Sequence, residues 1–243
     1  MDNIVEDLKS GALVPFLGMG VFKEVIAKDG STLPFDSDSM VLALNNGRAM
    51  SSRLMYEYSR AAMSLEQRKG REFIVQMTNH IYSSKEYEVP LVYTFLKEIQ
   101  PPYMIDTNMD DSACKVYEDV PHFMITGVSR VMGGYDRFVI YLYDVDTKQY
   151  NIVEKEKLNA DIPILFKKQY KQEKSYLFLG IDFGRDTFRM VANEITLGLK
   201  GGIVVEPKEE LSKKEQSFIE KHDLKAHRAE INDFIKAIQC AKS

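Results

Sequence analysis

Residues Leu13-Val-Pro-Phe-Leu-Gly-Met-Gly20 form the clearest strand signal in the chain. A short apolar run followed by a Gly-x-Gly turn is typical of a buried strand that ends in a tight loop. Comparable apolar runs follow at 103–105, 122–125, 162–166, 176–179 and 202–205. Because helical patterns separate several of these runs, the sequence predicts an α/β protein with a mostly parallel sheet covered by helices on both faces.

Two segments are expected as insertions in a single domain that spans residues 1–243. Apolar residues at helical spacing, such as Phe73, Ile74, Met77 and Ile81, predict a helical insertion at about 38–99. Strand-like runs at 137–143 and 149–153 flank a five-residue loop and predict a small β-hairpin insertion at about 136–154. Helices are also expected from about 186 to 199, from a capping box at 212–215, and over 231–238.

Composition excludes several classes of protein. The 243 residues are 44% apolar, and 32 basic against 36 acidic residues give a net charge of −4, with no dense basic run for nucleic acid. The longest apolar stretch, residues 12–22, is too short for a membrane helix, and the amino terminus lacks signal-peptide features, so we expect a cytoplasmic protein. Cys114 and Cys240 are too few for a zinc motif or a disulfide framework.

Residues after three of the predicted strands could carry chemistry, because ligands of such sheets bind at the carboxyl ends of the strands. Gly18-Met19-Gly20 could bring backbone N–H groups to a pyrophosphate, or form only a tight turn. Asp106-Thr-Asn-Met-Asp110 could orient a ribose and a water, or cap a helix. Gly180-Ile-Asp-Phe-Gly-Arg-Asp186 leads into a helix that Asp186 or Thr187 could cap. Lys23 stands where a dinucleotide fingerprint needs its third glycine, which disfavours a dehydrogenase.

The order of these motifs resembles the sirtuin-like family. Residues 13–20 are similar to its opening Gly-Ala-Gly-x-Ser motif, residues 102–111 to its Thr-Thr-Asn-Tyr-Asp motif, and residues 176–188 to its late Gly-Tyr-Ser-Leu motif. The resemblance spans most of the chain. It implies a Rossmann-like domain that binds NAD, with relatives that remove acyl groups from lysine or hydrolyse NAD in bacterial defence.

The resemblance also implies roles for individual residues. Gly18 and Gly20 would face the diphosphate, Asn108 would order the ribose and an attacking water, and Asp110 would lie beside the nicotinamide amide. Gly180 would lie against the adenosine. The complete set of implied cofactor-binding residues is Gly18, Met19, Gly20, Thr107, Asn108, Asp110, Gly180 and Asp182.

Departures from the family pattern weaken the expectation of catalysis. The counterpart of the strand that carries the catalytic His, Phe166-Lys-Lys-Gln-Tyr170, has no His, which leaves His122 as the candidate base. Phe22 and Asp182 replace two serines. A carboxylate at 182 would repel a phosphate unless it turned away to cap a helix. No zinc ribbon and no metal-ligand spacing occur, so no metal is expected.

Three functions follow as hypotheses. The first is a degenerate sirtuin-like protein that binds NAD, ADP-ribose or a related adenine nucleotide and acts as a sensor or regulatory subunit. The second is an active NAD glycohydrolase, rather than a protein deacylase, with Asn108 central and His122 or a partner's residue as the base. The third is a scaffold without nucleotide, whose cleft is filled by Phe22 and Met19. The sequence leaves open a protein partner or a homo-oligomer.

Overall fold

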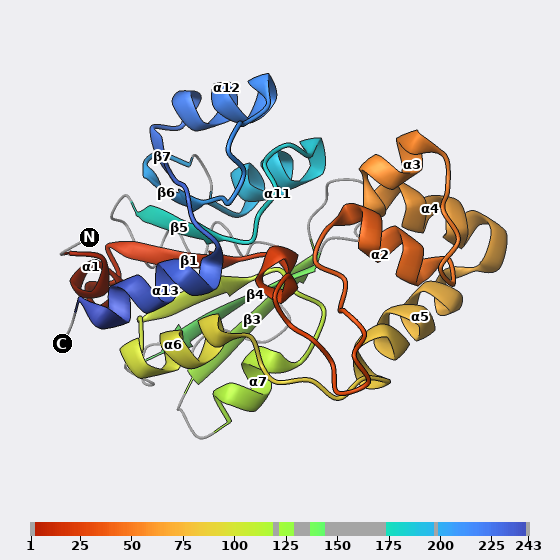
Figure 1. The fold of residues 1–243 in the computed structure, drawn as a ribbon, viewed down its shortest axis with the longest axis horizontal. Helices are drawn as coiled ribbons and strands as arrows, with labels where there is room; N and C mark the ends of the chain where they lie inside the picture. Colours follow the sequence, from red (N-terminus) through yellow and green to blue (C-terminus); the bar gives the residue numbers. More distant parts are fainter. Residues whose placement is uncertain (1–2, 119–121, 129–136, 144–173, 197–198, 242–243) are drawn as a thin grey trace.

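The computed structural model describes residues 3–118, 122–128, 137–143, 174–196 and 199–241. These residues form one seven-stranded sheet with the strand order β3-β4-β2-β1-β5-β6-β7 (Figure 1). Its five parallel strands are β2 (Tyr103–Asp106), β1 (Leu13–Leu17), β5 (Ser175–Leu179), β6 (Gly202–Val205) and β7 (Leu224–His227). The prediction of an α/β protein with a mostly parallel sheet is confirmed.

Side chains alternate between the two faces of the sheet, as the period of two in a strand requires. Leu13 and Leu17 of β1 belong to one apolar cluster, and Val14 and Phe16 belong to the other. The first face is covered by α1 (Ile4–Ser10), α6 (Leu91–Ile99) and α13 (Ile231–Cys240), and the second by α11 (Asp186–Thr196) and α12 (Lys213–Lys221). The central strands are therefore buried on both faces, which explains why β1 and β5 are apolar along almost their whole length.

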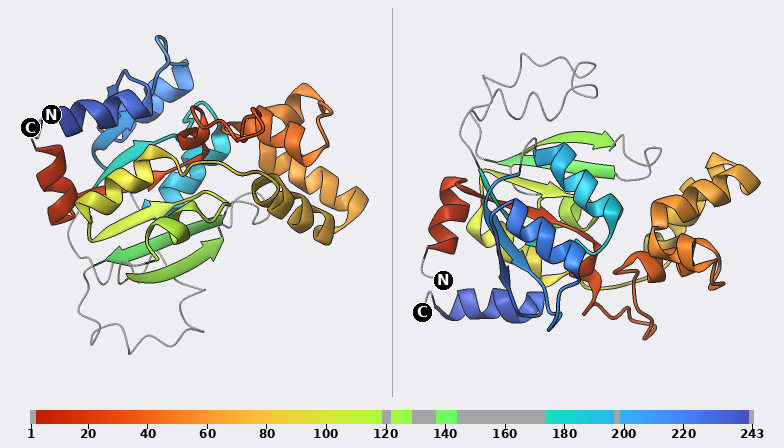
Figure 2. Two further views of the ribbon diagram at one scale, coloured as in Figure 1. Left: turned by 60° about the horizontal axis from the view of Figure 1, so that its bottom comes forward. Right: turned by 90° about the horizontal axis from the view of Figure 1, so that it is seen from above.

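The predicted helical insertion corresponds to two different parts of the structure. Helices α2 (Ser37–Leu44), α3 (Ser52–Tyr56), α4 (Tyr58–Lys69) and α5 (Arg71–Ser83) pack on one another and form what we call the helical block. This block lies beyond the end of the sheet to which β1 points (Figures 1 and 2). By contrast, α6 contributes Phe95, Leu96 and Ile99 to the core against the sheet.

The region of the predicted hairpin is only partly described. β4 (Arg137–Tyr143) lies inside the main sheet, antiparallel to both β2 and β3 (His122–Val128), and so does not belong to a separate small hairpin. Its expected partner at 149–153, the expected strand at 162–166 and the segment 166–170 lie outside the described residues. β7 was not predicted, because Leu224-Lys-Ala-His227 is a half-polar edge strand.

Local sequence signals account for the starts of two of the described helices, α12 and α2. The predicted capping box is present: Ser212 Oγ accepts a hydrogen bond from the Glu215 N–H at 3.3 Å, and Glu215 Oε2 accepts one from the Ser212 N–H at 2.8 Å. Asp36 and Ser39 form a second capping box at the start of α2. Among the helices of the described residues, none has the length and apolar character that a membrane crossing requires.

Candidate functional site

The three motifs meet at the carboxyl edge of the sheet, where the strand order reverses between β1 and β5. The Gly18 N–H donates to the Leu179 carbonyl at 2.9 Å, and the Gly20 N–H donates to the Gly180 carbonyl at 3.0 Å. On the other side, the Thr107 N–H donates to the Leu17 carbonyl at 3.0 Å. This edge is the position at which open α/β sheets bind ligands.

The glycines of the first motif serve the close packing of two loops. A Cβ at Gly20 would lie 2.7 Å from Gly180 Cα, and one at Gly18 would lie 2.3 Å from Ile181 Cδ1. These residues belong to η1 (Met19–Phe22) and the turn before it. Because the N–H groups of Gly18 and Gly20 already donate to carbonyl groups, neither is free for the diphosphate contact that the resemblance implies.

A small cavity adjoins the first and second motifs. Gly18, Met19 and Thr107 line it together, as expected, but Tyr58 and Phe188 reduce its volume to about 20 Å³. A cavity of this size holds about one water molecule. It cannot hold a dinucleotide in this conformation.

The second motif forms a buried hydrogen-bond network beneath α6. The carboxylate of Asp106 accepts a hydrogen bond from Tyr93 Oη at 2.9 Å and one from the Asn108 N–H at 2.9 Å, and Asn108 Nδ2 donates to Tyr93 Oη at 3.0 Å. Burial and the charge of Asp110 raise the pKa of Asp106 to about 7. These contacts fix the orientation of the Asn108 amide. Its buried Oδ1 atom has no hydrogen-bond partner among the described residues.

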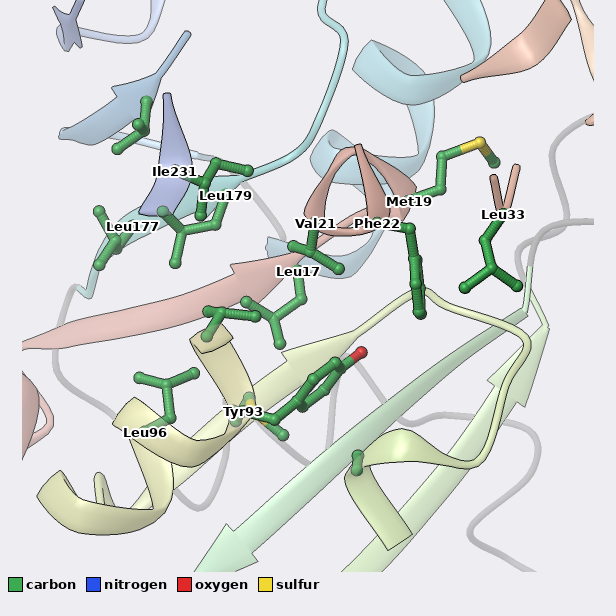
Figure 3. Close-up of a cluster of buried hydrophobic side chains, with 14 of the residues drawn as sticks. Leu17, Met19, Val21, Phe22, Leu33, Tyr93, Leu96, Leu177, Leu179 and Ile231 are labelled. Carbon is green, nitrogen blue, oxygen red and sulfur yellow. The ribbon is translucent and has the colours of Figure 1, made fainter. Parts of the chain in front are cut away.

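Aromatic rings close the same corner. Phe22, which stands where the resemblance expects a serine, is fully buried in the apolar cluster shown in Figure 3. Its ring centroid lies 5.9 Å from that of Tyr82 and 6.2 Å from that of Tyr87. Tyr87 Oη also donates to Asp110 Oδ2 at 3.3 Å. Burial raises the pKa of Asp110. The corner containing Asn108 and Asp110 is therefore packed like a core in this conformation.

A larger cavity lies at the carboxyl ends of β1, β5 and β6 and has a volume of about 200 Å³. It is lined by residues of the turn 20–24, the segment 35–36, the loops 180–182 and 205–208, and residues 230–231 at the start of α13. We call it the acidic hollow. Phe35, Ile181 and Val205 are among its apolar lining residues, so its wall combines apolar surface with charged groups.

The charge of the acidic hollow is negative. Its lining includes two amines, Lys23 and Lys208, and five carboxylates, which gives 2 − 5 = −3 when all are charged. The five carboxylates belong to Glu24, Asp36, Asp182, Glu206 and Glu230. Each amine is paired within the wall: Lys23 Nζ lies 2.5 Å from Glu230 Oε1, and Lys208 Nζ lies 2.8 Å from Asp182 Oδ1.

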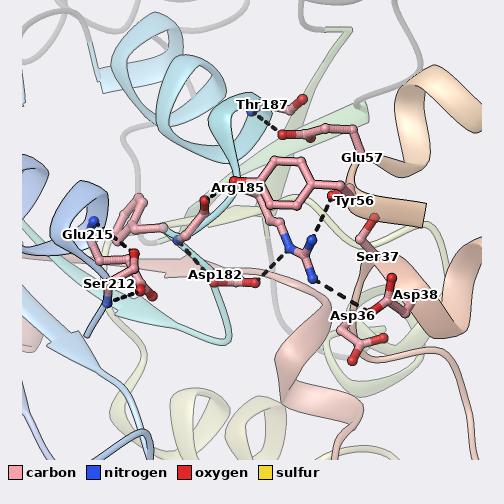
Figure 4. Close-up of polar contacts among 12 residues, drawn as sticks. Asp36, Ser37, Asp38, Tyr56, Glu57, Asp182, Arg185, Thr187, Ser212 and Glu215 are labelled. Atoms are coloured by element: carbon pink, nitrogen blue, oxygen red, sulfur yellow. Dashed lines mark hydrogen bonds and ion pairs between the residues drawn. The ribbon is translucent and has the colours of Figure 1, made fainter. Parts of the chain in front are cut away.

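Asp182 is turned toward the protein, not toward a ligand phosphate. Its Oδ1 atom accepts a hydrogen bond from the Gly184 N–H at 3.0 Å, and its Oδ2 atom lies 3.1 Å from Arg185 Nε (Figure 4). Burial alone would raise the pKa of Asp182, but the hydrogen bond and charge of Lys208 lower it. The carboxylate is turned away as expected, but it accepts its hydrogen bond in the turn at residues 183–184 and does not cap α11.

Three carboxylates in the described part of the chain lie close enough to share a cation. The oxygen atoms of Asp182, Glu206 and Glu215 lie within 4.8 Å of one another. Lys208 Nζ lies 2.8 Å from Glu215 Oε1 and 3.6 Å from Glu206 Oε2, in addition to its contact with Asp182. The lysine ammonium group therefore supplies the positive charge that this cluster needs.

Glu57 anchors the helical block to the start of α11. This residue is only 3% exposed, and its Oε1 atom accepts hydrogen bonds from the N–H groups of Asp186 at 2.8 Å and Thr187 at 3.3 Å (Figure 4). A carboxylate at this position is favoured by the dipole of α11. The start of α11 is thus capped by a distant residue and not, as expected, by Asp186 or Thr187 themselves.

Strand register separates His122 from Asn108. Asp106 at the end of β2 pairs with Val139, whereas His122 pairs with Tyr143, which is 143 − 139 = 4 positions along β4. At about 3.3 Å per residue, His122 is level with the amino end of β2, about 13 Å along the strands from Asp106. Asn108 follows the opposite end, so His122 is not retained as the base.

Sequence reasoning missed several residues of this edge. Glu206 and Lys208 directly follow the apolar run 202–205, so the same rule that selected the other three motifs could have found them. Tyr93 and Glu57 carry no such signal. Each resembles an ordinary helix residue until the fold brings its partners from another part of the chain.

No protein-family model and no curated protein sequence matches this chain.

Proposed function

We propose that this protein binds NAD or a related adenine nucleotide such as ADP-ribose, with the adenosine half in the acidic hollow. The observation that carries the proposal is the position of this hollow, at the carboxyl edge beside the reversal of strand order and next to Gly20 and Gly180. Open α/β sheets bind nucleotides at such a position.

The lining of the hollow suits a nucleoside. Phe35, Ile181 and Val205 offer apolar surface for a purine ring, and the buried carboxylate of Glu206 can accept hydrogen bonds from ribose hydroxyls. A volume of about 200 Å³ is below the roughly 300–1,000 Å³ of most small-molecule pockets. We therefore assign one half of a dinucleotide to it, with the diphosphate toward solvent.

A sensing or regulatory role fits these residues better than catalysis. The aromatic packing around Phe22 closes the corner that contains Asn108. His122 is level with the amino end of β2, away from that corner. A sensor acts through a partner, which can be another protein or a second copy of this chain. The nucleotide-free scaffold remains the alternative in which Phe22 and Met19 fill the cleft permanently.

One observation favours the second candidate function, an NAD glycohydrolase. The Asn108 amide is held in a fixed orientation, and its buried Oδ1 atom has no hydrogen-bond partner among the described residues. A ribose hydroxyl or a water would satisfy it after the corner opens. Nicotinamide release by the wild type that is lost in Asn108→Ala would support this activity. No nicotinamide release by either protein would contradict it.

The binding proposal is tested by calorimetric titration of the full chain with NAD and with ADP-ribose. We expect saturable binding that Phe35→Ala weakens at least about tenfold, because the variant removes apolar surface from the hollow. Phe73→Ala is the matched control: Phe73 packs against the same core cluster but does not line the hollow. No binding to the wild type, or equal effects of the two variants, would contradict the proposal.

A further inference from the structure

A second cavity lies on the α13 side of the sheet, beside the edge strand β7. Its volume is about 280 Å³, compared with about 200 Å³ for the acidic hollow. Helices α1 and α13 and strands β6 and β7 all contribute to its lining, and no residue lines both cavities. We call it the α1–β7 pocket. Because the two linings are separate, this pocket can take a ligand of its own.

The α1–β7 pocket has an apolar floor formed by Ile4, Ile203 and Phe234. Ile4 and Phe234 are buried members of the main apolar cluster, and Ile203 packs against that cluster. The ring centroid of His227 lies 4.9 Å from that of Phe234, so the imidazole packs on the same surface. A ligand with an apolar body would gain free energy by covering this floor.

The polar lining residues come as one pair from a helix and one pair from a strand. Asn3 and Asp7 are four positions apart along α1, which places them on one side of the helix. Lys225 and His227 are two positions apart on β7, so both side chains point to the same face of the sheet. The pocket therefore faces a carboxylate on one element and an amine on another.

The opposite charges of Asp7 and Lys225 are not used within the described part of the chain. The two groups form no ion pair with each other, and neither charged group has another polar partner among the described residues. Asp7 makes its contacts within α1 through its main chain, where its N–H donates to the Asn3 carbonyl at 2.8 Å. This arrangement differs from the acidic hollow, in which both amines are paired and carboxylates are in excess.

We infer that the α1–β7 pocket binds a free α-amino acid with an apolar side chain. The Asp7 carboxylate accepts hydrogen bonds from the ligand's ammonium group, and Lys225 and His227 bind its carboxylate. Charge-assisted hydrogen bonds of this kind are stronger than neutral ones. The side chain of the ligand covers the apolar floor. A volume close to the lower end of the roughly 300–1,000 Å³ of small-molecule pockets suits a ligand of this size. The inference is independent of the proposed nucleotide binding.

The test is calorimetric titration of the full chain with leucine, and with three compounds that each lack one part of it. Isocaproate lacks the ammonium group, leucinamide lacks the carboxylate and glycine lacks the apolar side chain. We expect saturable binding of leucine, weakened at least about tenfold in each of the three compounds. Equal binding of leucine and glycine, or no binding of leucine, would overturn the inference.

Matched variants assign the two charges. Asp7→Asn should weaken leucine binding at least about tenfold but leave isocaproate binding unchanged, because isocaproate has no ammonium group. Lys225→Gln should weaken leucine binding to a similar extent and leave leucinamide binding unchanged. Glu6→Gln and Lys221→Gln alter exposed charges outside the lining and are the controls. Thermal unfolding checks that each variant is folded. Unchanged leucine binding in folded Asp7→Asn and Lys225→Gln would overturn the assignment of the ligand to this pocket.

Discussion

The hydroxyl group of Tyr93 donates a 2.9 Å hydrogen bond to the carboxylate of Asp106 beneath α6, where both residues are buried. Asn108 binds both partners, so one network joins α6, the end of β2 and the loop that follows. Burial of a carboxyl group costs much more free energy when the group is charged than when it is neutral. The stability of this protein should therefore depend on the protonation of Asp106.

The sign of this dependence follows from the pKa of Asp106, which rises from an ordinary value of 3.8 to about 7 on folding. Between these values the folded state binds more protons than the unfolded state, so stability falls as the pH rises from about 4 to about 7. The contribution of Asp106 is at most about 4 kcal/mol. In Asp106→Asn, urea denaturation across this range should show a much shallower loss of stability. Asp111→Asn, an exposed neighbour, is the control. Parallel pH profiles for wild type and Asp106→Asn would count against the account.

The anchor between the helical block and α11 gives a second prediction. Glu57→Ala removes the acceptor for the Asp186 and Thr187 N–H groups and should destabilise the protein by about 1–3 kcal/mol. Glu57→Gln retains an acceptor without the charge and should cost less. Glu88→Ala alters an exposed glutamate and is the control in chemical denaturation. A stability loss no larger than that of the control would exclude an anchoring role.

Alanine substitutions at two glycines with similar φ angles distinguish the cost of backbone strain from the cost of steric crowding. Gly180 has φ +77° and a Cβ there would lie 2.5 Å from the Val21 nitrogen, whereas Gly47 has φ +75° and open space around it. Gly47→Ala should cost only about 1–2 kcal/mol, the penalty of the left-handed conformation. Gly180→Ala should cost clearly more, because the loop after β5 and η1 must move apart. Equal unfolding midpoints would show that these loops tolerate separation.

Much of the fold could be predicted because its local signals agree with its tertiary environment. The apolar runs that became β1, β5 and β6 are buried on both faces, and the capping box at Ser212 and Glu215 forms as expected. β7 could not be predicted, since Lys225 and Ala226 are exposed on an edge strand. The position of β4 was missed because antiparallel pairing with β2 depends on contacts distant in sequence.

The candidate site was predictable in position and less so in detail. The rule that ligands bind at the carboxyl ends of parallel strands correctly predicted that the three motifs lie at one edge, where Gly18, Thr107 and Gly180 line the same small cavity. It could not show that the glycine N–H groups donate to protein carbonyls, or that Phe22 packs between Tyr82 and Tyr87. Those relationships depend on three-dimensional packing, which the spacing of residues along the chain does not predict.

The central claim is that the acidic hollow, and not the closed corner around Asn108, receives the adenosine half of a nucleotide. A crystal structure of the full chain with ADP-ribose tests it most directly. We predict a purine ring between Phe35 and Val205, with ribose hydroxyls within hydrogen-bond distance of Glu206. A nucleotide bound elsewhere, or a hollow that stays free of ligand under saturating ADP-ribose, would contradict the claim.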